Sequence, residues 1–211
     1  MRIRMLAAAA AVGLLLAGCG PTTPTGNGPT TSAAAAQPAA APTTSSAPVV
    51  KDLTPGNCTI YPKASAVALI GAVNLNNTAL DIGTDGGTKI DACSYLDLQG
   101  TTLQGISYAV VRYDSAATAY AEAQKVQTEM LGDANEHAWA VQSLTAPVPN
   151  AGPLLGGSGT KNEDGITATI AVVGTNVGPY LVAALGGSTV SEDNAKKFAL
   201  AVFQSLAGSV S

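Results

Sequence analysis

The chain has 211 residues and a mildly acidic formal net charge of −4, with 46% hydrophobic but only 4% aromatic residues. It contains no basic run and no alternation of basic with aromatic residues, so a nucleic-acid partner is not expected. The single histidine, His137, excludes a zinc site built from several imidazoles. The glycine-rich pieces lack the lysine and the spacing of nucleotide-binding loops. We therefore expect neither a cofactor nor a metal.

The N-terminal residues are typical of an exported protein. An apolar run from Met5 to Ala17 follows two arginines and is shorter than the roughly 20 residues of a membrane-spanning helix. This pattern predicts a signal peptide over residues 1–18. The end of the run resembles the lipobox of bacterial lipoproteins at all four positions, which are Leu16, Ala17, Gly18 and Cys19.

The lipobox resemblance implies cleavage before Cys19 and attachment of a diacylglycerol to its thiol. The expected location is the extracytoplasmic face of the cell membrane, with the lipid on Cys19 as the membrane contact. Stable anchoring takes more than one acyl chain, and acylation of the freed amino group of Cys19 would supply the next. The alternative is an ordinary signal peptide that leaves Cys19 as a free thiol.

Residues 19–50 contain no charged and no aromatic residue and are rich in Pro, Thr and Ala. Such a segment cannot bury enough apolar surface to offset its ordering entropy, so we predict a disordered tether. It would lift a domain off the membrane, or serve only as a spacer, and its Ser and Thr residues near Pro are candidates for O-glycosylation. Charged and aromatic residues appear from residue 51 onward, and residues 51–211 are predicted to form one globular domain.

The two remaining cysteines, Cys58 and Cys93, are predicted to form a disulfide. With Cys19 lipidated they form an even pair in an oxidising compartment. A redox-active or metal-binding pair is the alternative, but the spacing is not C-x-x-C and the chain has no histidine cluster.

Local patterns predict three helices and two strand pairs. Proline at the first turn predicts a short first helix. The second helix is longer and is predicted from a cap at Ser115 and an apolar stripe of Ala119, Ala123, Val126 and Met130. A capping-box spacing predicts the last helix. The predicted helices cover residues 62–73, 115–132 and about 189–206. Alternating or continuous apolar runs predict hairpins over residues 92–100 with 106–114 and residues 165–174 with 179–187. Residues 75–91 are expected to be loop, and residues 134–144 are ambiguous between helix and strand.

These elements predict an α+β domain. Its antiparallel sheet would be built from the two hairpins, with the three helices packed mainly on one face. In the first hairpin, Ile106, Tyr108 and Val110 should lie on one face of the sheet and Ala109 and Val111 on the other.

Together these features resemble small cell-envelope lipoproteins of actinobacteria, of the mycobacterial type, and among them a family of unknown function. The shared features are the lipobox, the tether, Cys58 just before the first predicted helix and Cys93 at the start of the first hairpin. The glycine-rich residues 148–159 match loosely, because the acidic residue expected after the glycine is missing. The resemblance implies the location and the fold, since the family has no settled activity.

Few residues indicate catalysis. No G-x-S-x-G motif is present, and the glycines from Gly156 to Gly159 are expected in a loop. The segment from Asp81 to Ala92 is similar to a calcium loop but has Ala92 where a bidentate Glu is needed. His137 beside Trp139 is interpreted as a surface or partly packed residue. No residue is therefore assigned a catalytic, cofactor-binding or metal-binding role.

Two classes of function remain. The first is a non-catalytic binding or adaptor module of the cell envelope that recognises a lipid, a wall component or an envelope protein. The alternative is an envelope hydrolase or transferase in which His137 and a carboxylate converge in a pocket. An apolar cavity of several hundred Å³ between sheet and helices would favour a lipid.

Overall fold

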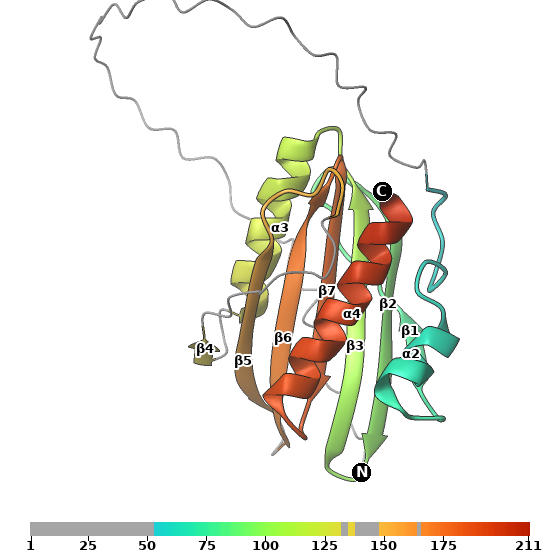
Figure 1. The fold of residues 1–211 in the computed structure, drawn as a ribbon, viewed down its shortest axis with the longest axis vertical. Coiled ribbons are helices and arrows are strands. Elements are labelled where there is room, and N and C mark those ends of the chain that lie inside the picture. The colour runs from blue at the N-terminus through green and yellow to red at the C-terminus, as the bar shows by residue number, and fades with distance from the viewer. Residues whose placement is uncertain (1–52, 132–134, 138–147, 164–165) are drawn as a thin grey trace, which may run out of the picture.

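The domain contains an antiparallel sheet and flanking helices, as the α+β prediction requires. The computed structural model describes residues 53–131, 135–137, 148–163 and 166–211. Within these residues there are seven strands in one sheet, in the order β1-β2-β3-β7-β6-β5-β4, and three helices (Figure 1). The strands are β1 (Asn76–Ala79), β2 (Thr88–Gln99), β3 (Thr102–Arg112), β4 (Asn135–His137), β5 (Leu155–Glu163), β6 (Ile166–Val177) and β7 (Tyr180–Ser188).

The two predicted hairpins form the centre of the sheet. They are β2–β3 and β6–β7, and the pairing of β3 with β7 joins them. The first turn is tighter than predicted: residues 102–105 belong to β3, and the chain reverses at Gly100, whose φ of 63° suits glycine. Ile106, Tyr108 and Val110 share one face and Ala109 and Val111 the other, as predicted.

The sheet is larger than two hairpins. Strand β1 lies inside residues 75–91, which were expected to be loop, and the glycines of residues 156–159 lie in β5 instead of a loop. Glycine is unfavourable in strands, but β6 supplies β5 with a partner over its whole length. Of the ambiguous residues 134–144, residues 135–137 form β4 and the others lie outside the described residues.

The helices begin and end close to the predicted residues. Helix α2 (Lys63–Ile70) stops at Gly71, whose φ is 80°, earlier than predicted. Helix α3 (Ala116–Leu131) begins after Ser115, whose hydroxyl accepts a hydrogen bond from the Thr118 amide at 3.1 Å. Helix α4 (Glu192–Val210) is capped by Ser191 and extends four residues past the predicted end.

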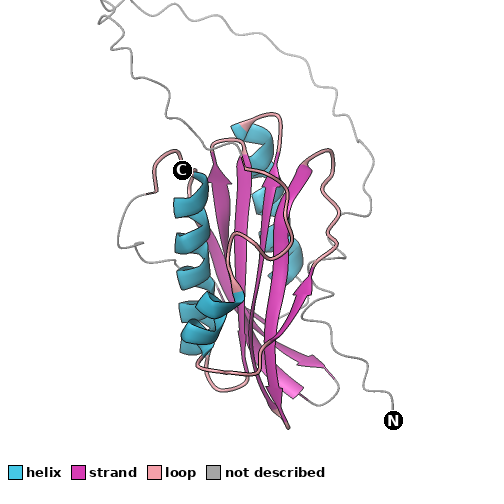
Figure 2. Cartoon of the chain, turned by 90° about the vertical axis from the view of Figure 1, so that its right-hand side faces the viewer, coloured by secondary structure: helices cyan, strands magenta, loops and turns pink. Residues whose placement is uncertain are grey.

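The helices cover both faces of the sheet, so the prediction that they pack mainly on one face is wrong for α3 (Figure 2). Helix α4 packs with α2 on the face that carries Tyr108, and α3 packs on the face that carries Val111. Helix α4 contacts β3, β6 and β7 on one face, whereas α3 contacts β5, β6 and β7 on the other. Among the described residues, no helix is both long and apolar enough to cross a membrane.

The segment before α2 is fixed to β2 by a disulfide and a buried carboxylate. Cys58 and Cys93 are bonded, with their Cα atoms 5.1 Å apart, which confirms the predicted pairing. Asp91 is fully buried and accepts hydrogen bonds from the backbone amides of Cys58, Thr59 and Ile60 at 2.6–2.7 Å. Its carboxylate also accepts from the hydroxyls of Thr59 and Tyr108, both at 3.1 Å.

Candidate ligand-binding groove

A small apolar groove lies beside α3 on the face of the sheet opposite α4. Its floor is formed by β3 and β7, α3 forms one wall, and the segment between β1 and β2 forms the opposite wall. The apolar lining includes Ile82, Val111, Val126, Leu181 and Ala183. The groove holds about 40 Å³. This volume is far below the roughly 300–1,000 Å³ of typical small-molecule pockets, so the groove has room only for a small group.

One charged side chain lines this groove. Glu122 of α3 is only 7% exposed, and its Oε1 atom accepts a hydrogen bond from the ammonium group of Lys125 at 2.5 Å. Its Oε2 atom is buried and has no hydrogen-bond partner among the described residues. A buried polar atom without a partner costs about 1–3 kcal/mol, so it calls for an explanation.

The helical period explains why Glu122 faces inward. It lies three residues after Ala119 and four before Val126, within the apolar stripe of α3 that packs on the sheet. Glu122 was not among the residues predicted to have a functional role, although its neighbours in that stripe were predicted to face the core. The signal was available, because a carboxylate at the spacing of an apolar stripe is uncommon unless it is paired.

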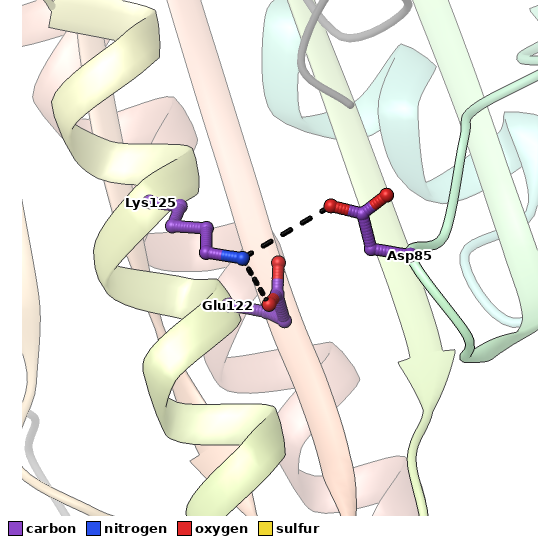
Figure 3. Close-up of polar contacts among 3 residues, drawn as sticks. All are labelled: Asp85, Glu122 and Lys125. Carbon is purple, nitrogen blue, oxygen red and sulfur yellow. Dashed lines mark hydrogen bonds and ion pairs between the residues drawn. The ribbon is translucent and has the colours of Figure 1, made fainter. Parts of the chain in front are cut away.

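The surroundings of Glu122 are acidic. Lys125 also lies 4.0 Å from a carboxylate oxygen of Asp85, so one ammonium group stands between two carboxylates (Figure 3). Tyr113 lines the same groove, and burial, followed by the charges of Glu122 and Asp85, raises the pKa of its phenol to about 12. Tyr113 therefore remains neutral near pH 7, and the charge at the groove comes from Glu122, with Lys125 and Asp85 beside it.

The walls of the groove lack an activated nucleophile within the described part of the chain. Ser107 lines it, but the Ser107 hydroxyl donates to the hydroxyl of Ser94 at 2.9 Å and not to a base. A serine nucleophile needs a general base within hydrogen-bond reach. The described residues also contain no group of three acidic, histidine or cysteine side chains that could hold a metal ion.

A second, polar hollow of about 320 Å³ lies at the end of β2 and β3. Thr88, Arg112 and Asp114 line it together with Tyr113, which is shared with the apolar groove. Its walls contain no buried polar atom left without a partner among the described residues. The apolar groove is therefore the better candidate for a ligand site.

The predicted site residues have different outcomes. Cys58 and Cys93 are joined, whereas Leu16, Ala17, Gly18 and Cys19 lie outside the described residues. His137 is the register partner of Ser158 in the pairing of β4 with β5.

The neighbourhood of Ser158 offers little support for the hydrolase alternative. Ser158 is fully buried, and its hydroxyl donates to a carboxylate oxygen of Glu192 at 2.7 Å. A serine whose proton is held by a carboxylate and which a substrate cannot reach is not arranged as a nucleophile with a histidine base.

Comparison with known proteins gives no family assignment. The sequence matches no protein-family model and is not significantly similar to any curated protein.

Proposed function

We propose that this protein is a non-catalytic binding module of the cell envelope, and that the apolar groove beside α3 is its ligand site. The observation that carries the proposal is the buried Oε2 atom of Glu122, which lacks a partner among the described residues in a wall that is otherwise apolar. Ligand sites typically combine mostly apolar walls with a few polar groups that fix orientation. A donor group on a ligand would satisfy this oxygen.

The size of the groove bears on the type of ligand. Its volume of about 40 Å³ is well below the several hundred Å³ that would favour a carried lipid. This supports recognition of a wall component or another small group over transport of a whole acyl chain.

The protein is further proposed to be an extracytoplasmic lipoprotein anchored through Cys19. The lipobox residues and the charge-free residues 19–50 support this part, as does the disulfide, because disulfides persist in oxidising compartments. Changing Cys19→Ala should move the protein from the detergent phase to the aqueous phase in a detergent partition experiment. Unchanged partitioning would rule out the anchor but would leave the groove proposal untouched.

The binding proposal can be tested by filling the groove. Ala183 lines it and is nearly buried, so Ala183→Leu would occupy most of the available volume. The matched control is Val73→Leu, which adds one methylene to a side chain that is 82% exposed and does not line the groove. Both variants and the wild-type protein are incubated with envelope extract, repurified and examined by native mass spectrometry for bound small molecules.

The expected result is a bound small molecule on the wild type and on Val73→Leu, but not on Ala183→Leu. Thermal denaturation first verifies that the Ala183→Leu variant is folded, because overpacking can cost about 1–3 kcal/mol. Equal retention by all three proteins would refute the groove as the ligand site.

A further inference from the structure

The groove has the dimensions and the charge to receive a short aliphatic chain that ends in an ammonium group. We infer that the buried part of the ligand is such a chain, as in the side chain of a lysine or of another amino-terminated residue of a peptide. This inference rests on the proposed binding function of the groove and specifies what the groove binds.

The walls and the volume define the aliphatic part. Ile82, Val111, Val126 and Leu181 present hydrocarbon on the floor and on both sides of the groove. The small volume fits a short aliphatic chain and excludes a complete acyl chain. Burial of each methylene contributes about 0.8 kcal/mol, so this short chain supplies modest affinity and the polar end decides selectivity.

The Glu122 carboxylate defines the polar end. An ionised carboxylate only accepts hydrogen bonds, so the group that satisfies Oε2 must be a donor. Rotation about the terminal torsion of Glu122, which has a broad energy profile, can turn Oε2 toward the groove while Lys125 follows on its flexible stem. A carboxylate ligand would bring two acceptors together and is excluded on this ground.

The local charge favours an ammonium group over a neutral hydroxyl. Glu122 and Asp85 contribute two negative charges, and Lys125 contributes one positive charge that lies between them. A cationic donor adds a favourable charge beside these carboxylates, and charge-assisted hydrogen bonds are roughly twice as strong as neutral ones. Lys125 and Asp85 are both about half exposed, so solvent screens both of their charges, and the buried Glu122 carboxylate dominates the local field.

The test compares probes that differ only at the end group. Butylamine, butanol and butyrate are titrated into the wild-type protein, and binding is followed by chemical-shift changes of the Ala183 and Val111 methyl groups. We expect butylamine to bind at least tenfold more tightly than butanol, and butyrate not to bind. Equal affinity for butylamine and butanol, or tighter binding of butyrate, would overturn the inference.

Two variants attribute the preference to the acidic wall. Glu122→Gln removes the charge but keeps the size and should abolish the preference for the amine, whereas Lys125→Met removes the competing ammonium group and should tighten amine binding. Asp193→Asn, an exposed change of the same charge on α4, is the matched control and should leave all affinities unchanged. Because Lys125 is half exposed, Lys125→Met remains informative if Glu122→Gln fails to fold. Weaker amine binding by Lys125→Met would contradict the assignment.

The source of the amine is resolved by further probes. A peptide containing lysine is compared with the same peptide containing norleucine, and with a soluble wall fragment that carries an amino-terminated side chain. Preference for either amine-bearing probe supports the inference and identifies the source. A different result would be that butanol binds as tightly as the amines and that Ala183→Leu prevents its binding. In that case the groove proposal survives and the ammonium inference fails. If no probe binds and Ala183→Leu retains the envelope ligand, the proposed function fails as well.

Discussion

The buried carboxylate of Asp91 should be the largest single electrostatic contributor to the stability of the N-terminal part of the domain. Asp91→Asn replaces one of its two oxygens by an amide group that donates instead of accepting. In the less damaging orientation the amide replaces Oδ1 and faces the backbone N–H of Cys58, while the oxygen at the Oδ2 position keeps the bonds from Thr59, Ile60 and Tyr108. That orientation still leaves one buried amide of the chain without an acceptor.

The magnitude follows from the number of bonds. An unsatisfied buried donor costs about 1–3 kcal/mol, and the four remaining bonds each lose roughly 1 kcal/mol when the acceptor is no longer charged. The neutral asparagine no longer has the free-energy cost of burying a charge, which offsets part of this sum. We therefore expect the free energy of unfolding to fall by about 3–5 kcal/mol. Such a loss is a large share of the 5–15 kcal/mol by which domains are typically stable.

The assay is urea denaturation at neutral pH with the disulfide intact, followed by circular dichroism. The matched control is Asp97→Asn on the same strand, because Asp97 is also nearly buried but accepts a hydrogen bond only from the Gln99 side chain among the described residues. Asp97→Asn should cost about 1 kcal/mol. A loss below about 1 kcal/mol for Asp91→Asn, or equal losses for both variants, would refute the reasoning.

Three further outcomes are expected. Thiol titration of the denatured, non-reduced domain without Cys19 should find no free thiol, and replacing Cys58 by Ser should lower the free energy of unfolding by about 4 kcal/mol, because the bond to Cys93 closes a loop of 35 residues. Gly186→Ala should cost about 1–3 kcal/mol because its Cβ would overlap a backbone carbonyl oxygen of α4, whereas the adjacent Gly187→Ala meets only a side-chain carbon at 3.8 Å and should be nearly neutral. Stability should fall as the pH rises from 10 toward 12, because the folded-state pKa of Tyr113 is raised to about 12 and the unfolded chain releases that proton first. Phenolate absorbance measured in parallel with unfolding checks this, and Tyr113→Phe should reduce the fall in stability per pH unit over this range.

The sequence by itself determined the features that depend on neighbouring residues. The Ser115 cap of α3 and the two central hairpins follow from capping chemistry and apolar periodicity. The disulfide followed from an even cysteine pair in a chain that is predicted to be exported. The cap of α4 shows the limit of such patterns: the capping-box spacing starts at Thr189, but Ser191 caps the helix because Thr189 bonds the backbone amide of Leu103 instead.

Only the tertiary structure decided the features that depend on pairing between distant segments. Strand β5 is too rich in glycine to be predicted by propensity and is a strand because β6 lies beside it. The side on which α3 packs depends on the pairing of β3 with β7, which fixes the face that Val111 and Ala183 share. Helical spacing alone shows that Glu122 faces the interior, but not that this interior is a groove between α3 and the segment before β2. We propose a binding role for the Glu122 carboxylate because the fold buries one of its oxygens without a partner among the described residues.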